Sequence, residues 1–256
     1  MPHITPAHFL QKKVRIALVG CGGNGSQMLT GLARLNHALT ALGHPGLSVC
    51  AFDPDTVSDA NMGRQLFGSF DVGSSKAHVL VNRINAFFGL DWQSVFEQYK
   101  EGRFDCDMMI ACVDSAKARH GIAHTFSYRR PQYLMDLGNR AADGQVLFGE
   151  LDMDDDLHGT AQGSVRLPSP YAILPELVDQ FAVEDDTPSC GLAEALERQE
   201  LFINQAIVTP ALSILWEFFR YGRLTWHGAF VNLRTGSMRP LQVKEPEAAA
   251  ADGSNN

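Results

Sequence analysis

The feature that most constrains this chain is the stretch 14–25, which reads Val-Arg-Ile-Ala-Leu-Val-Gly-Cys-Gly-Gly-Asn-Gly. Its apolar run is typical of a strand that is buried on both faces, as in parallel sheets covered by helices. Glycines allow a tight turn and let backbone N–H groups approach a phosphate, and the helix that follows would direct the positive end of its dipole at the same group. We therefore expect a nucleotide-binding turn, with the candidate residues Gly20, Gly22, Gly23 and Gly25.

The glycine pattern alone does not identify the ligand. It is compatible with dinucleotide dehydrogenases, methyltransferases and adenylating enzymes, and also with a glycine turn that binds nothing. The formal net charge of −8 argues against unspecific binding to nucleic acid or to an anionic membrane, because both favour a basic surface. No apolar run long enough to span a bilayer and no signal-peptide pattern are present, so we expect a cytoplasmic location. The five cysteines include no C-x-x-C pair, and no zinc site is predicted.

Strand and helix patterns alternate along the first part of the chain, which predicts a Rossmann-like, doubly wound α/β fold with a mostly parallel sheet. Antiparallel additions are expected towards the C-terminus, at 145–151 and in a hairpin over 225–243. A long helix is expected from Leu192 to Tyr221, kinked or restarted at Pro210. The predicted strands are 14–19, 47–52, 95–98, 108–113 and 133–138, and the other predicted helices are 27–42, 76–88 and 115–128.

The predicted organisation is a single domain with one long crossover. Residues 1–151 form the nucleotide-binding core, and 152–190, rich in acidic residues and prolines, form a crossover segment that is at least partly mobile. Residues 191–244 complete the same domain with a helix and a hairpin. The polar tail 245–256 is expected to be disordered.

Three charged residues stand where chemistry would need them. Asp53 ends the second predicted strand, which is where this kind of sheet places a carboxylate that bonds ribose hydroxyls. Arg64 and Lys76 offer two cations, which suit a triphosphate that is attacked at its α-phosphorus better than they suit hydride transfer to NAD. The alternatives are that Arg64 and Lys76 are surface charges and that Asp53 only forms a turn beside Pro54.

The order and spacing of several motifs resemble those of the ThiF/MoeB/HesA adenylating family, relatives of the ubiquitin-activating enzymes, over about residues 14–150. These motifs are Gly20-Cys-Gly-Gly-Asn-Gly25, Asp53-Pro-Asp-Thr-Val-Ser-Asp-Ala-Asn61-Met-Gly-Arg64-Gln65, Lys76, and Ala-Cys-Val-Asp114. The resemblance implies that Asn61, Arg64, Lys76 and Asp114 are catalytic. It also implies that Asp53, Gln65 and the glycines bind ATP, and that Asp114 lies near Mg²⁺, which takes hard oxygen ligands. Alternatively, Asp114 caps the helix that follows it.

The resemblance also implies a reaction and a partner. The terminal carboxylate of a small ubiquitin-like protein or peptide would attack the α-phosphate of ATP, giving an acyl adenylate and pyrophosphate. Residues 187–197 and 201–205 resemble the ThiF-related component of the bacterial PRTRC cassette, which implies that the ubiquitin-like partner is co-encoded. A homodimer is common in the family. An NAD-dependent oxidoreductase and a non-catalytic nucleotide-binding scaffold for a ubiquitin-like partner are the alternatives.

One departure from the family concerns its cysteines. Many members carry two C-x-x-C pairs that bind zinc, and these are missing here. Some members form a thioester on a cysteine after the crossover, and Cys190 in Thr-Pro-Ser-Cys-Gly is the candidate for that role. A helix after Cys190 would lower the pKa of its thiol, but a structural cysteine is the alternative.

Overall fold

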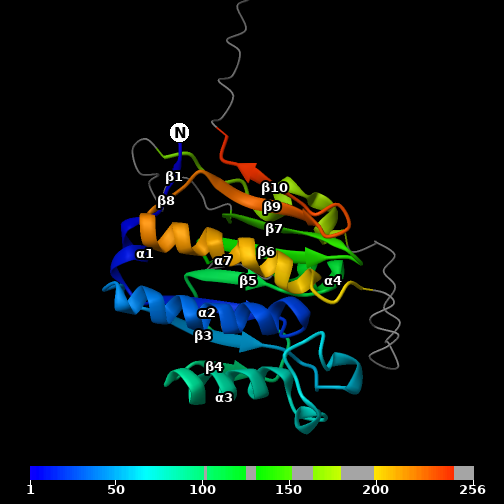
Figure 1. The fold of residues 1–256 in the computed structure, drawn as a ribbon. Coiled ribbons are helices and arrows are strands. Elements are labelled where there is room, and N and C mark those ends of the chain that lie inside the picture. The colour runs from blue at the N-terminus through cyan, green and yellow to red at the C-terminus, as the bar shows by residue number, and fades with distance from the viewer. Residues whose placement is uncertain (101–102, 125–130, 152–163, 180–198, 245–256) are drawn as a thin grey trace, which may run out of the picture.

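The computed structural model describes residues 1–100, 103–124, 131–151, 164–179 and 199–244. Within these residues, one eight-stranded sheet runs through the molecule in the order β10-β9-β7-β6-β5-β2-β3-β4 (Figure 1). Its strands are β2 (Val14–Val19), β3 (Leu47–Phe52), β4 (Gln93–Val95), β5 (Met108–Ala111), β6 (Tyr133–Asn139), β7 (Asp143–Glu150), β9 (Trp226–Asn232) and β10 (Ser237–Gln242). A separate two-stranded sheet pairs β1 (His3–Ile4) with β8 (Arg223–Leu224).

The sheet changes direction at β6. Strands β4, β3, β2, β5 and β6 are parallel neighbours. Strand β7 pairs antiparallel with β6 and β9, and β10 closes the hairpin with β9. The predicted fold class, a mostly parallel sheet with antiparallel C-terminal additions, is confirmed.

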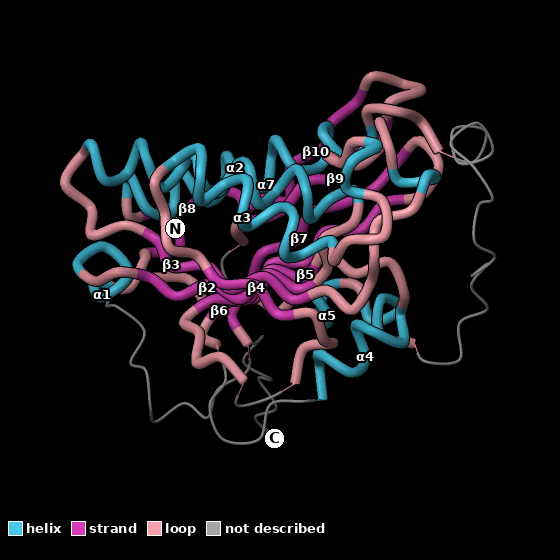
Figure 2. Tube along the Cα trace, turned by 90° about the horizontal axis from the view of Figure 1, so that it is seen from below, coloured by secondary structure: helices cyan, strands magenta, loops and turns pink. Residues whose placement is uncertain are grey.

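Helices cover both faces of the sheet (Figure 2). On one face lie α2 (Gly23–Ala41), α3 (Lys76–Phe88) and α7 (Ile203–Tyr221). On the other face lie α4 (Ala116–His124) and the short α5 (Pro170–Ile173). The remaining helical elements of the described residues are α1 (Ala7–Gln11) and the 3₁₀ turns η1 (Asp59–Asn61), η2 (Ser69–Asp71) and η3 (Pro175–Val178).

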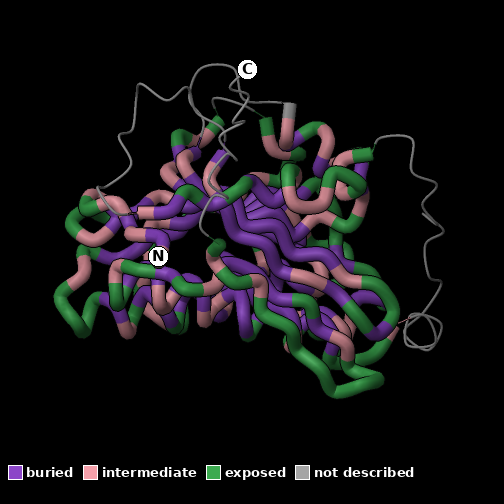
Figure 3. The backbone as a smooth tube through the Cα atoms, turned by 90° about the horizontal axis from the view of Figure 1, so that it is seen from above, coloured by how far each residue is buried: buried purple, intermediate pink, exposed green. Residues whose placement is uncertain are grey.

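The core follows the central strands (Figure 3). Strand β5 is buried along its whole length, as expected for a parallel strand between two helical layers. In the antiparallel half, Tyr133 stacks on Phe148 and meets Phe218 of α7 edge to face, with ring centroids 5.2 and 5.0 Å apart. Aromatic pairs of this kind add to the apolar area that they bury, so they fix α7 on the sheet.

Some predicted elements have other limits. Helix α7 begins at Ile203, and residues 199–202 before it are not helical, so the predicted helix from Leu192 to Tyr221 is not continuous. The first part of that prediction, 192–198, lies outside the described residues. The helix continues through Pro210, which neither ends nor restarts it. The strand expected over 95–98 lies at Gln93–Val95.

Parts of the predicted organisation fall outside the described residues. Of the expected crossover segment 152–190, only residues 164–179 are described, and the tail 245–256 is not. The candidate nucleophile Cys190 also lies outside the described residues. Among the helices that the structure describes, none is long and apolar enough to cross a membrane.

Candidate functional site

The glycine turn joins β2 to α2 at the carboxyl edge of the parallel strands. Gly20 has a φ of +92°, and a Cβ on it would lie 2.7 Å from the carbonyl oxygen of Cys112. A Cβ on Gly25 would overlap the Gly20 carbonyl, so these two glycines are required by the backbone itself. Gly22 differs, because a Cβ there would have only the Gln65 amide nitrogen near it, at 4.0 Å. Gly22 therefore leaves space above the turn, as an approaching phosphate requires.

Asp53 fastens the glycine turn to the end of β3. One carboxylate oxygen accepts the Cys21 N–H at 2.5 Å, and the other accepts the Asp55 N–H at 2.8 Å. Burial raises the pKa of Asp53, and these two N–H groups work against that rise. Each oxygen keeps a further lone pair, so binding of a ribose by Asp53 stays a prediction.

Lys76 is the first residue of α3 and is 8% exposed, so the alternative that it is a surface charge is wrong. Its ammonium group pairs with Asp55 at 2.9 Å. The charge of Lys76 also lowers the pKa of Asp53 and that of the Cys21 thiol, against the larger effect of burial, which places this cation near the glycine turn. An ammonium group has three donors, and the bond to Asp55 uses one of them.

Arg64 and Gln65 lie on the irregular loop between β3 and α3. A terminal nitrogen of Arg64 donates to the Gln199 side chain at 2.6 Å, while its Nε is buried without an acceptor. Among the described residues Arg64 forms no ion pair; burial lowers its pKa and the charge of Asp114 raises it. Asn61 has a structural contact in this loop, because its side-chain oxygen accepts the Ser58 N–H at 2.9 Å and closes η1.

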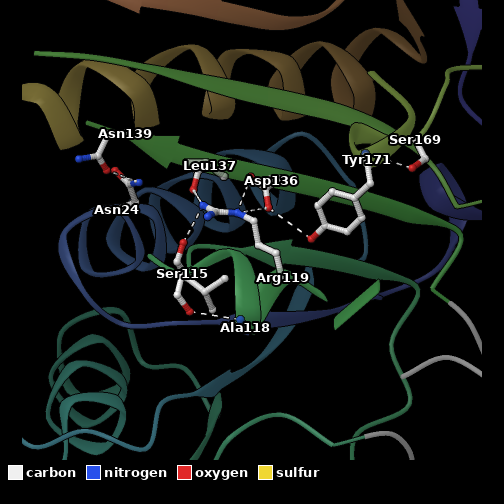
Figure 4. Close-up of polar contacts among 10 residues, drawn as sticks. Asn24, Ser115, Ala118, Arg119, Asp136, Leu137, Asn139, Ser169 and Tyr171 are labelled. Carbon is white, nitrogen blue, oxygen red and sulfur yellow. Dashed lines mark hydrogen bonds and ion pairs between the residues drawn. The ribbon is translucent and has the colours of Figure 1, made fainter. Parts of the chain in front are cut away.

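Asp114 follows β5 at the carboxyl edge of the sheet and is exposed. The Ser115 hydroxyl accepts the Ala118 N–H at 3.2 Å, so Ser115 caps α4 and Asp114 does not (Figure 4). The described residues contain no group of three or more side chains that would hold a metal ion. Mg²⁺ usually takes one or two carboxylates and completes its shell with water and phosphate oxygens, so Asp114 is compatible with it.

A buried ion pair beside Asp114 was not predicted (Figure 4). Arg119 of α4 bonds the fully buried Asp136 of β6 through its Nε at 3.0 Å, and Tyr171 donates to the same carboxylate at 3.3 Å. Arg119 also donates to the carbonyl of Val113 at 2.7 Å and so ties α4 to the end of β5. Burial lowers the pKa of Arg119, but Asp136, Tyr171 and Asp114 together outweigh burial and raise it.

Three asparagines at the turn were also missed. The Nδ2 atom of Asn24, in the first turn of α2, donates to the Oδ1 atom of Asn139 at the end of β6, at 2.9 Å (Figure 4). The amide of Asn204 lies directly against Gly23, where a Cβ would approach it to 2.5 Å. The neighbours of Asn204 come from the other end of the chain, so no local pattern could have identified it.

The buried polar atoms without a partner gather at this turn. In the described part of the chain they are Asn24 Oδ1, Arg64 Nε, Gln65 Oε1 and Asn204 Nδ2. Native proteins leave few such atoms, and each one needs an explanation. A ligand that carries both donors and acceptors would satisfy them, and a nucleotide with its phosphates is of that kind.

A hollow of about 540 Å³ lies elsewhere, at the amino ends of the strands. Its lining includes Lys13, His37, Leu47 and Trp92, and none of the predicted site residues. Ligands of open α/β sheets bind outside the carboxyl ends of the strands, so this hollow is not the nucleotide site.

Comparison with known proteins agrees with the fold and the motifs. Residues 10–217 match the ThiF family, and the chain belongs to that family. Over 79 residues it is 38% identical to the catalytic subunit of the Nedd8-activating enzyme E1 of Drosophila melanogaster, covering 30% of this chain and 16% of that protein. The chain thus spans about a sixth of the length of the curated relative that it matches.

Solved structures with similar folds include MccB of E. coli, with a TM-score of 0.58 and 14% identity over 97% of this chain and 67% of that one. The structure of MccB with ATP has a TM-score of 0.57 at 12% identity, covering 94% of this chain and 67% of that one. PaaA has a TM-score of 0.55 at 15% identity, covering 90% of this chain and 64% of that one. At these identities the likeness concerns the fold, which is that of the E1-like adenylating proteins.

Proposed function

We propose that the chain binds MgATP at the glycine turn and adenylates the terminal carboxylate of a protein or peptide. The observation that carries this proposal is the gathering of buried, unpartnered polar atoms around the turn, beside an arginine that has no carboxylate partner among the described residues. An arginine whose hydrogen-bond partner among the described residues is a neutral amide suits an anionic ligand. Membership of the ThiF family supports the same reaction class.

In this proposal each residue has a role that follows from its position in the fold. Gly22 leaves room for the phosphates, and the first turn of α2 offers them backbone N–H groups. Asp53 stands at the end of β3 to meet the ribose, and Arg64 and Lys76 hold the negative charge of the phosphates. Asp114 would hold Mg²⁺, which neutralises charge on the phosphates when it is bound. The attacking carboxylate is already ionised at neutral pH and needs no general base.

The acyl substrate is a small ubiquitin-like protein, co-encoded as the resemblance of residues 187–197 to the PRTRC component implies. MccB, whose fold is similar, was solved with MccA, which supports a peptide-like substrate. A homodimer and a thioester on Cys190 remain predictions drawn from the family resemblance. The alternative function is a scaffold that binds ATP without turning it over, and the experiment must distinguish this function from catalysis.

The test compares Arg64→Ala with Arg103→Ala, a control that removes an arginine from the exposed pair with Glu97. Wild type and control are expected to gain thermal stability from MgATP but not from NAD, and to exchange pyrophosphate into ATP when the acyl substrate is present. Loss of charge stabilisation in Arg64→Ala should lower exchange about 10²-fold or more. Equal exchange by Arg64→Ala and the control would refute the role of Arg64. ATP binding without exchange in the wild type would favour the scaffold.

A further inference from the structure

Two buried amides flank the glycine turn, and each has one atom without a partner. Asn24 is 6% exposed and Asn204 is 3% exposed. The Oδ1 atom of Asn24 has no donor, and the Nδ2 atom of Asn204 has no acceptor. A buried polar atom that is left without a partner destabilises the folded state. The two atoms are complementary, since one needs a donor and the other an acceptor.

Both amides are held beside Gly23. The carbon and both outer atoms of the Asn204 amide would lie 2.5–2.6 Å from a Cβ on Gly23, so this amide lies flat on the turn. Asn24 is the next residue in the chain, and its bond to Asn139 draws its side chain towards the end of β6 (Figure 4). The two amides thus come from different helices and lie beside neighbouring residues of the turn, because Asn204 of α7 contacts Gly23 and Asn24 follows Gly23 in α2.

The helix that carries Asn204 also favours an acceptor at this point. Helix α7 has 19 residues, and its N-cap residue, Phe202, makes no side-chain cap. It runs parallel to α2, because Asn204 meets Gly23 and Leu212 meets Gly31. Two helix N-termini therefore face the same edge of the sheet, where their N–H groups attract an electronegative atom.

The order of the strands separates these amides from the nucleoside. Strand β3, which ends just before Asp53, is the neighbour of β2 on one side, whereas β5 and then β6 lie on the other. Asn24 is tied to β6 through Asn139, and Asn204 belongs to α7, which packs on β6 and β7. A nucleotide with its ribose at Asp53 and its phosphates at the turn places its reacting phosphorus towards the amides. In that arrangement the acyl group is the part of the substrate nearest to Asn24 and Asn204.

We infer that Asn24 and Asn204 bind the last peptide group of the acyl substrate. Asn24 Oδ1 accepts the N–H of that group and Asn204 Nδ2 donates to its C=O, so both unsatisfied atoms gain partners. This inference rests on the proposed adenylation and narrows its substrate class to a carboxylate preceded by an unsubstituted peptide bond. A simple carboxylic acid lacks the group, and a terminal proline lacks the N–H.

The test uses two non-reactive probes that differ in one group. N-acetylglycyl sulfamoyl adenosine carries the peptide N–H, and acetoxyacetyl sulfamoyl adenosine has an ester oxygen in its place. Both are titrated calorimetrically into wild type, Asn24→Leu, Asn204→Leu and Thr209→Val, a control on the exposed side of α7. Wild type and control should bind the amide probe about five- to tenfold more tightly, as expected for one hydrogen bond. Asn24→Leu should lose this preference, and Asn204→Leu should bind both probes more weakly.

The outcomes distinguish failure of this inference from failure of the proposed function. Equal affinity of the wild type for the two probes, or an unchanged preference in Asn24→Leu, overturns the inference. Plain sulfamoyl adenosine, which has no acyl group, serves as the reference: if the wild type binds none of the three compounds, the proposed function fails instead. If a leucine variant does not fold, the alanine variant at the same position removes the same polar atoms with less bulk.

Discussion

On the β3 side of the glycine turn, Asp53 joins the turn to the end of β3 through the Cys21 N–H, and Lys76 pairs with Asp55. Asp53 bonds the N–H of Asp55, and Asp55 pairs with Lys76 at 2.9 Å. On the β6 side, Asn24 and Asn204 meet partners from distant segments, whereas Arg119 and Asp136 are 17 residues apart. Asn24 reaches Asn139, and the Arg119–Asp136 pair joins a helix to a strand beyond it.

The two sides also treat charge differently. On the β3 side Asp55 is largely exposed, so water screens its pair with Lys76 and a ligand can compete for the ammonium group. On the β6 side, Asp136 is fully buried and Arg119 nearly so, and each charge depends on the other. The β3 side is thus suited to exchange partners with a nucleotide, whereas the β6 side is a fixed frame. The predictions below test that contrast.

The largest effect is expected from Arg119→Met. This change leaves the Asp136 carboxylate buried without its cation, which should lower the free energy of unfolding by about 3–5 kcal/mol. Denaturant titration measures it, with Arg83→Met as the matched control. Arg83 is half exposed and pairs with Asp71 at 2.7 Å, so its loss should cost less than about 1 kcal/mol.

A double variant separates lost charge balance from lost packing. Adding Asp136→Leu to Arg119→Met removes the uncompensated carboxylate and should recover most of the lost stability, because apolar residues can replace a buried ion pair. If Arg119→Met proves no more costly than Arg83→Met, the β6 side is not the fixed frame described above.

A second pair of variants distinguishes the glycines that shape the turn from the one that leaves space. Gly20→Ala must adopt a φ of +92° and meet the Cys112 carbonyl, so it should lose about 2–3 kcal/mol of stability. Gly22→Ala meets only the Gln65 amide at 4.0 Å and should stay within about 0.5 kcal/mol of wild type. Its Cβ stands in the phosphate space, so its stabilisation by MgATP should be lost. Normal MgATP stabilisation of Gly22→Ala would place the phosphates elsewhere.

The same contrast explains what the sequence could predict. The limits of β2 and β3 and the first residue of α3 follow from local apolar patterns, and the structure has them as expected. The charged and glycine residues near these elements are local signals as well. Asn139 and Asn204 carried no signal, because their role depends on segments that meet only in the folded chain. Asp136 did carry a signal, because it is a lone carboxylate within the apolar run Tyr-Leu-Met-Asp-Leu. A cationic partner could have been sought for it, and Arg119 lies five residues after Asp114.

A fall in pH should change the stability contributions of the buried histidines and of Asp53 in opposite directions. Burial lowers the pKa of His3, in β1, and of His227, in β9, so the unfolded chain binds more protons below about pH 6.5. Their contribution to stability is therefore lost as the pH falls below that value. Burial raises the pKa of Asp53, so the folded state binds more protons just above the ordinary aspartate pKa of about 3.9. The contribution of Asp53 to stability therefore rises as the pH falls through that window.

The smallest predicted effect is a change in the pH dependence of stability in the variant His227→Gln. The ring Nδ1 of His227 bonds the Phe148 carbonyl at 2.8 Å, and glutamine offers a donor that does not titrate. Between pH 6.5 and 5, the loss of stability on acidification should become shallower by up to about 1.4 kcal/mol per pH unit, the limit for one proton. Denaturant titrations at successive pH values measure the slope, with His37→Gln on exposed α2 surface as the control. If both variants keep the wild-type slope, protonation of His227 is not what weakens the antiparallel half.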